Sequence, residues 1–175
     1  MSYYEFTGET TTAPNGAVLQ RIRATKDLPK HGVSVGDVGG WIESESNLSG
    51  NAWVFGNAWV FGNARVFGDA RVFGDAQVFG DARVFGDAWV FEQQDIITVT
   101  PVGSESVTAT AFRIKGGHVL HVGCWTGTVD ALAAEVDRQA KNWRCDQDTA
   151  ARWRAEYAAL EELVRARLTG WAASA

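Results

Sequence analysis

The sequence has few cysteines, few prolines and no long apolar run. Cys124 and Cys145 are the only two cysteines, too few for a disulfide framework. The opening MSYYEFTGETTT has neither the basic nor the apolar segment of a secretion signal. No stretch approaches the roughly 18 consecutive apolar residues of a transmembrane helix. These absences argue against a disulfide-rich secreted domain and against a membrane span, and we expect a soluble, cytoplasmic protein.

Basic residues are also in the minority. Lysine and arginine number 16 against 21 aspartates and glutamates, which gives a net charge of −5. Proteins that bind nucleic acids usually carry a basic surface that displaces counterions from phosphate. The composition therefore argues against a nucleic-acid partner.

What the sequence does contain is a repeat with a period of six. The run NAWVFG NAWVFG NARVFG DARVFG DAQVFG DARVFG DAWVF extends from Asn51 to Phe91. Two degenerate hexads precede it in the same frame, with aliphatic residues at the valine position and small residues at the alanine position: Ile42, Leu48, Gly40 and Ser46. We therefore expect a ladder of nine hexads that begins near Gly40.

The side chains of each hexad alternate between two faces. In an extended Ala-x-Val step, Ala and Val point to one side and the intervening residue points to the other. The intervening residues are Trp53, Trp59, Arg65, Arg71, Gln77, Arg83 and Trp89. Arginines stacked inside a narrow tube would each cost several kcal/mol as buried, unpaired charges. Alanine and valine are therefore predicted inside, with Gly and the following Asn or Asp at the corners.

This small-x-aliphatic hexad resembles the left-handed parallel β-helix of hexapeptide-repeat proteins. The resemblance implies triangular coils of three hexads, so that residues 18 apart stack about 4.8 Å from one another. Phe stands where that family often has Gly, directly after the aliphatic residue. The predicted fold is mainly β, with a short left-handed parallel β-helix of about three coils over residues 40–96.

A wider resemblance includes the flanks. The segments LQRIRATKDLP, VSVGDVGGWIESESNLSGNAWV, PVGSESVTATAFR and GCWTGTVDALAAEV are similar to uncharacterised hexapeptide-repeat proteins carried by phages and prophages. The resemblance implies an architecture and a mobile-element origin but no activity.

The two flanks are suited to covering the strand edges that an open β-helix leaves at its ends. In residues 1–39 we expect a strand pair, 3–7 and 17–23, joined by a turn at Pro14-Asn15-Gly16.

Residues 97–175 are expected to form a small α+β module. The predicted strands are 97–102, 106–114 and 119–124, and the predicted helices are 129–141, capped by Thr128, and 148–168, ended by Gly170. The second helix carries a stripe of aromatic and aliphatic residues. That stripe either packs on its own sheet or forms an oligomer seam.

No catalytic residue, cofactor or metal site is expected. Hexapeptide acyltransferases use a histidine base near the coils, and hexapeptide carbonic anhydrases hold zinc with histidines. The repeat has no histidine, since His31, His118 and His121 all lie in the flanks. Cys124 lies roughly 20 Å along a strand from His118, so a packed thiol is predicted rather than a nucleophile. The corner Asn and Asp residues could form a calcium ladder, but a turn role is favoured.

The outer face of the repeat is the predicted binding surface. Trp53, Arg71 and Trp89 should form one column, and the other candidates are Trp59, Arg65 and Arg83. Tryptophan and arginine are enriched in binding hot spots. The sequence thus predicts a non-catalytic interaction or scaffold protein that binds itself, as a trimer or dimer, or a host protein.

Two other functions remain open. One is sequestration of a small nucleotide-like ligand between subunits, and the other, less favoured, is an acyltransferase-like activity. The outer residues could also cover one another or lie beneath a flank.

Overall fold

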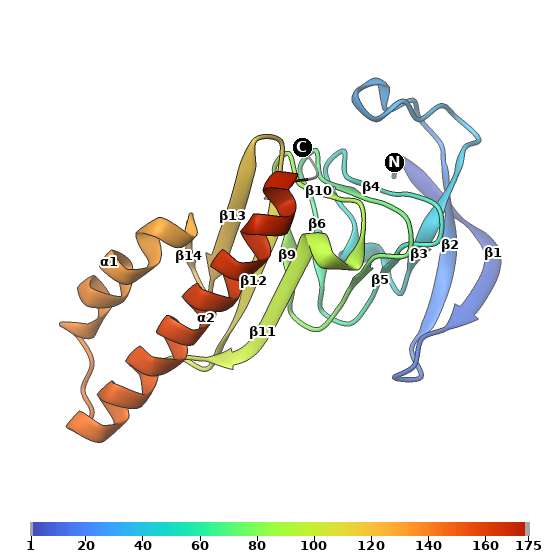
Figure 1. Cartoon of the computed structure of the whole chain (residues 1–175). Helices are drawn as coiled ribbons and strands as arrows, with labels where there is room; N and C mark the ends of the chain where they lie inside the picture. Colours follow the sequence, from blue (N-terminus) through green and yellow to red (C-terminus); the bar gives the residue numbers. More distant parts are fainter. Residues whose placement is uncertain (1, 174–175) are drawn as a thin grey trace. The chain divides into compact units, whose positions relative to one another are not determined.

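The computed structural model describes residues 2–173 (Figure 1). The chain divides after Ile96 into two compact units. Within residues 2–173, none of the helices combines the length and apolar character needed to cross a membrane.

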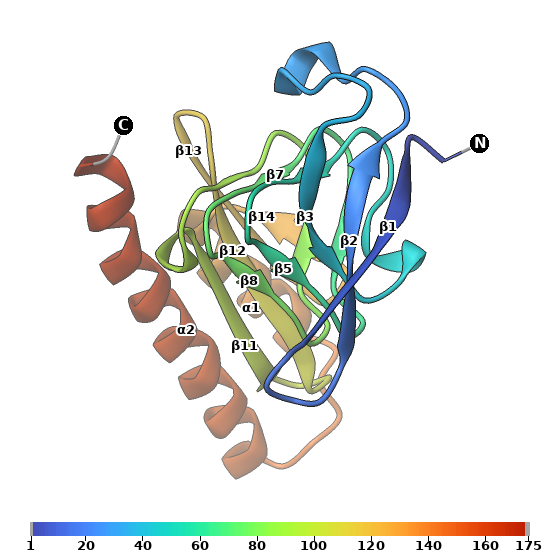
Figure 2. The same ribbon diagram turned by 90° about the vertical axis from the view of Figure 1, so that its right-hand side faces the viewer.

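The first unit begins with three antiparallel strands, which lie side by side in Figure 2. They are β1 (Tyr4–Thr12), β2 (Val18–Ala24) and β3 (Val38–Ile42). The pairing of β1 with β2 is interrupted by a bulge between Phe6 and Thr10. Strand β3 also pairs in parallel with the second strand of the repeat, so the flank continues directly into the repeat.

Each complete hexad contributes one short strand. The strands are β4 (Trp53–Val54), β5 (Trp59–Val60), β6 (Arg65–Val66), β7 (Arg71–Val72), β8 (Gln77–Val78), β9 (Arg83–Val84) and β10 (Trp89–Val90). They pair in parallel as three columns, β4-β7-β10, β3-β5-β8 and β6-β9. Val72, for example, pairs with Val54 on one side and with Val90 on the other. Paired residues are thus 18 apart, the spacing expected from three hexads.

The alanines and valines of the repeat form a buried interior. All seven valines and the alanine two residues before each are 0% exposed, as is Ile42. This confirms the predicted interior. Glycine at the corners allows the coils to approach closely. At Gly74, which has a φ of 61°, a Cβ atom would lie 2.7 Å from the carbonyl oxygen of Phe91.

Two corners depart from the Gly-Asx pattern and correct the predicted frame. Short 3-10 turns, η2 (Glu45–Asn47) and η3 (Gln93–Asp95), take the place of the usual corner. Ser46, predicted at a buried alanine position, is exposed on η2, and Asn47 is buried instead. The turns still return the chain to the frame, because Leu48 and Ile96 beyond them are buried.

Polar side chains stabilise both of these turns. Asn47 Nδ2 donates to the carbonyls of Gly62 and Ala64 at 3.0 and 2.8 Å, and its Oδ1 accepts from the Ser44 backbone at 2.8 Å. In η3, the Asp95 carboxylate accepts from the backbone N–H of Phe91 at 2.9 Å. At both irregular turns, a buried amide or carboxylate thus makes hydrogen bonds to backbone groups of the first unit.

The second unit is a four-stranded sheet with two helices. The strands, in spatial order, are β11 (Ile96–Val102), β12 (Val107–Ile114), β13 (Gly117–Val122) and β14 (Trp125–Gly127). The helices are α1 (Val129–Ala140) and α2 (Gln147–Ala173). The stripe on α2 packs into this unit's own core, where Tyr157, Leu160 and Val164 lie with Leu120 and Leu132.

Two helix-terminal predictions for this unit are wrong. Helix α2 continues through Gly170 instead of ending there, because a glycine that has no other signal to stop a helix only lowers its propensity. Thr128 occupies the N-cap of α1, but its side chain makes no capping bond. His118 replaces it, since its Nε2 accepts the backbone N–H of Val129 at 2.9 Å. Burial lowers the pKa of His118, which favours this neutral acceptor.

Candidate functional site

The phenylalanines of the repeat form stacked columns outside the buried valines and alanines. Ring centroids are 4.2 Å apart for Phe55 and Phe73 and 4.6 Å for Phe73 and Phe91, with nearly parallel planes. Two more stacks are formed by Phe61–Phe79 and Phe67–Phe85. At the ends of two columns, Phe79 and Phe91 are 45% and 39% exposed.

Trp53 does not lie on the outer surface, which corrects the predicted binding column. Its side chain is 1% exposed. The covering element is β3, where a Cβ atom added to Gly39 would lie 2.8 Å from the indole. The glycine leaves the space that the indole fills, so Trp53 is part of the core and no partner can reach it.

The other five predicted residues occupy three different columns. Arg65 and Arg83 are exposed and pair in register on β6 and β9. Trp59 lies between Trp41 and Gln77 and packs against the Ala13, Leu19 and Phe61 cluster, which half-buries it. Arg71 pairs with Trp89 on one side and with the buried Trp53 on the other, whereas Arg65 and Arg83 lie in another column. The structure therefore does not unite the six residues in one exposed surface.

Arg71 and Trp89 belong to a continuous group with two phenylalanines. The Arg71 guanidinium lies 5.3 Å from the Trp89 ring centroid, a cation–π distance. Trp89 meets Phe91 edge to face at 5.6 Å, and Phe91 stacks on Phe73. We call Arg71, Phe73, Trp89 and Phe91 the aromatic–arginine patch.

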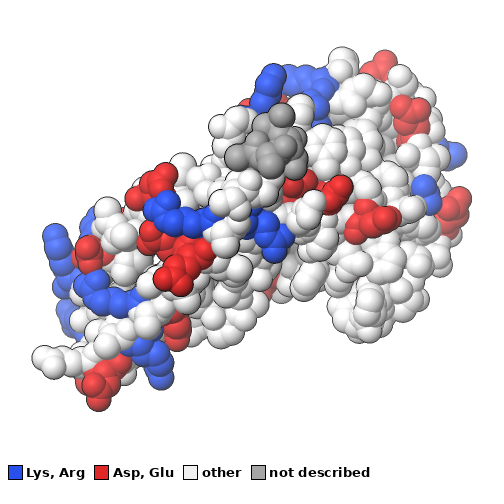
Figure 3. Space-filling view, viewed as in Figure 1, with Lys and Arg blue, Asp and Glu red and all other residues white. Residues whose placement is uncertain are grey.

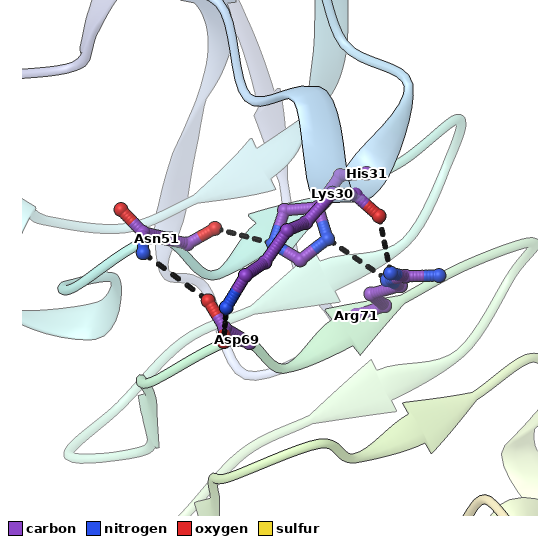
Figure 4. Close-up of polar contacts among 5 residues, drawn as sticks. All are labelled: Lys30, His31, Asn51, Asp69 and Arg71. Carbon is purple, nitrogen blue, oxygen red and sulfur yellow. Dashed lines mark hydrogen bonds and ion pairs between the residues drawn. The ribbon is translucent and has the colours of Figure 1, made fainter.

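A turn from the flank contacts Arg71, one residue of this patch (Figure 4). The turn is η1 (Pro29–His31). His31 Nδ1 accepts from Arg71 Nε at 2.8 Å, and the Lys30 carbonyl accepts from Arg71 Nη2. His31 Nε2 lies 2.7 Å from the Asn51 carbonyl. Lys30 Nζ pairs with Asp69 at 2.7 Å. Two residues of the turn therefore bind Asn51, Asp69 and Arg71 of the repeat.

The contact contains one ion pair, between Lys30 and Asp69. The hydrogen bond from Lys30 holds the pKa of Asp69 below its ordinary value, and the same bond raises the pKa of Lys30. Burial lowers the pKa of His31, so the imidazole is neutral at pH 7. The turn therefore docks through one ion pair and one neutral imidazole. On the face of the molecule in Figure 3, basic and acidic side chains are likewise interspersed.

Some of the corner Asn and Asp side chains form hydrogen bonds with one another. Asn51 donates its amide to Asp69 at 3.1 Å, and Asn63 donates to Asp81 at 3.0 Å. Among residues 2–173 there is no group of three or more His, Cys, Asp or Glu side chains placed to hold a metal ion. Two of the corner carboxylates, Asp69 and Asp81, thus have hydrogen-bond partners within the repeat.

Cys124 is exposed, contrary to the predicted packed thiol. It follows Gly123, which has a φ of 59°, in the tight connection between β13 and β14. A strand was predicted to continue to this residue, but the turn ends it and directs Cys124 to solvent.

The repeat is similar to a known solenoid family. The family described as the YdcK beta solenoid repeat matches residues 64–78 and 76–92. These residues include the last five strands of the repeat and all four residues of the aromatic–arginine patch. A search of the curated proteins found no match to the chain.

Substitution of Arg71 tests whether the turn is docked as described. Arg71→Glu removes both hydrogen bonds to the turn and the contact with Trp89, and we expect it to lower the free energy of unfolding by about 2 kcal/mol. Arg65→Glu, at an exposed position on the next strand column, is the matched control and should change it by less than about 0.5 kcal/mol. Urea denaturation measures both. Equal effects would contradict the docking role of Arg71.

Proposed function

We propose that this chain is a non-catalytic interaction protein that associates through the aromatic–arginine patch. The partner is a second copy of the chain, in a dimer or trimer, and a host protein could use the same patch. The hexad resemblance supports a left-handed parallel β-helix, and the flank resemblance supports a phage-derived protein. The low cysteine content supports a cytoplasmic location.

The observation that carries this proposal is that the fold does not require phenylalanine on its outside. In the first coil, the backbones of Glu43 and Ser49 make the same bonds to the next coil as those of Phe61 and Phe67. The fold thus accepts polar residues at this position of the hexad. The interior of the repeat is formed by the buried valines and alanines. An exposed apolar patch that folding does not need usually marks an interface.

The chemistry of the patch suits binding. Its three rings offer apolar area and stacking, and its guanidinium offers hydrogen bonds to carboxylate or carbonyl groups. Tryptophan and arginine side chains of this kind supply much of the energy of protein interfaces.

A second candidate function is sequestration of a small nucleotide-like ligand where subunits meet. The observation that favours it is the Arg71 guanidinium beside the Trp89 indole. A guanidinium binds phosphate in a bidentate manner, and an indole stacks on a base. Calorimetry with mononucleotides tests this candidate, and an absence of heat with the assembled protein would contradict it.

Phe91→Ser tests the first candidate. The variant should associate at least about tenfold more weakly, because it removes an exposed ring at the centre of the proposed contact. Its free energy of unfolding should fall by about 2 kcal/mol, because Phe91 loses its stack on Phe73 and its edge-to-face contact with Trp89.

Phe79→Ser is the matched control. It makes the same change at a similarly exposed ring that lies outside the patch. Light scattering after gel filtration gives the association of each variant over a range of concentrations. Equal weakening by the two substitutions, or no weakening by Phe91→Ser, would contradict the proposal.

A further inference from the structure

The contact between His31 and Arg71 requires a particular protonation state. Arg71 Nε carries a proton and donates to His31 Nδ1, so Nδ1 must be unprotonated. Nε2 then carries the imidazole proton and donates to the Asn51 carbonyl. A second proton on the ring could only be placed on Nδ1, where it would face the N–H of a guanidinium that never loses its charge.

The surroundings of His31 do not compensate for that second proton. Arg71 faces it from β7 and Lys30 lies beside it in the turn, and both disfavour a charged ring. Asp69 favours a charged ring, but its carboxylate is already bound by Lys30 and by the Asn51 amide. Asp87 acts on Lys30 from the next corner of the repeat. The ring is also partly removed from water, which disfavours its charged form.

From this geometry we infer that His31 is a pH-sensitive latch on the aromatic–arginine patch. Neutral His31 holds the turn over Arg71, and protonated His31 releases the guanidinium for an anionic group of the partner. This inference rests on the proposed function, because the group that is released belongs to the proposed binding surface.

The direction of the pH dependence follows from the lowered pKa. A histidine whose folded-state pKa is lowered contributes its full stabilisation above the ordinary value of 6.5. That contribution is lost as the pH falls below 6.5 toward the folded-state pKa. The Lys30–Asp69 pair stays intact in this range, because the pKa of Asp69 lies below the ordinary 3.8. Only the imidazole of this contact changes charge between pH 7.5 and 5.5.

The test compares the native chain with His31→Gln at pH 7.5 and pH 5.5. Glutamine can accept from Arg71 and donate to the Asn51 carbonyl, yet it stays neutral at both values. The first readout is the exchange rate of the Arg71 Nε proton by NMR, corrected for the intrinsic effect of pH. At pH 5.5, one unit below the ordinary pKa, protection should fall by up to about tenfold in the native chain and should not fall in His31→Gln.

The second readout is self-association of the same two proteins at both pH values. Association of the native chain should strengthen at pH 5.5 relative to that of His31→Gln. Titration of His118 occurs in both proteins, so it does not contribute to the difference between them. Equal protection of Arg71 at both pH values, or equal loss in both proteins, would overturn the latch. If Arg71 is released at pH 5.5 but the native chain and His31→Gln associate equally, His31 does not control binding through the patch.

These failures differ from failure of the proposed function. The proton-exchange readout needs no partner, so it reports on the latch even in a monomer. If Phe91→Ser associates as strongly as the native chain at both pH values, the patch is not the interface, whatever the behaviour of His31.

Discussion

Val72→Asp is expected to abolish soluble folding. Val72 is 0% exposed and stacks between Val54 and Val90 in the middle of its column. A carboxylate at this position would have no partner, and its burial should cost more than the ~5 kcal/mol at the lower end of the stability of most domains. Soluble yield and far-ultraviolet circular dichroism give the result.

Gln77→Lys is the comparison for this substitution. Gln77 lies on β8 with its side chain outside the interior and half-buried. A lysine there should keep its charge in water, and the unfolding free energy should change by less than about 0.5 kcal/mol. A folded Val72→Asp protein, or comparable damage by the two substitutions, would show that the valines are not the interior.

Asn47→Ala should produce the second largest loss of stability. The substitution leaves the carbonyls of Gly62 and Ala64 and the N–H of Ser44 without their side-chain partner. Because Asn47 is 0% exposed, water cannot replace it, and we expect a loss of about 3 kcal/mol.

Asn57→Ala makes the same chemical change at an exposed, regular corner. It should cost no more than about 0.5 kcal/mol, because the corner depends on backbone geometry more than on the amide. Urea denaturation midpoints of the two variants decide between these expectations. Similar midpoints would mean that the turn at Glu45–Asn47 does not depend on its buried side chain.

The interior of the repeat could be predicted because its determinants are local. Alternation of side chains within each Ala-x-Val step and the cost of burying Arg65, Arg71 or Arg83 fix which face is inside. The spacing of 18 between paired residues followed from the hexad resemblance. Each of these rules applies within one or two hexads, so no knowledge of the flanks was needed.

The outer surface could not be predicted in the same way, because the flanks decide what remains exposed. Trp53 and Trp89 occupy equivalent positions in the repeat, yet β3 buries the first and leaves the second half-exposed. Two residues of the flank decide which side chains of the repeat are covered. Gly39 leaves space for the Trp53 indole, and His31, the single histidine of the first unit, binds Arg71. Neither has a periodic pattern, and both act through contacts between residues far apart in the chain.

Irregular corners and helix ends were missed for a related reason. Asn47 and His118 each bond to backbone groups that are distant in sequence, 15 to 17 residues away for Asn47 and 11 for His118. The hexad pattern favours Ser46 as a buried residue, and the residues around Val129 favour Thr128 as the cap, because both patterns are local to one hexad or one helical turn. In both places a residue other than the expected one makes the hydrogen bonds. The fold is the same, but the buried polar group lies at a different position in the sequence.

The match to the YdcK beta solenoid repeat agrees with the strand pairing and concerns the repeat alone. The aromatic–arginine patch lies within the matched residues, whereas the turn that contacts Arg71, Pro29–His31, lies outside them. The patch is thus a property of the repeat, and its contact with the turn is a property of the flank.

Sedimentation velocity of the native chain over a range of micromolar concentrations tests the central claim most directly. If the patch is an interface, the native chain should sediment as a dimer or trimer, and Phe91→Ser should shift it toward the monomer while Phe79→Ser does not. A native chain that sediments as a clean monomer throughout, with Phe91→Ser indistinguishable from it, would contradict the claim that the patch mediates self-association.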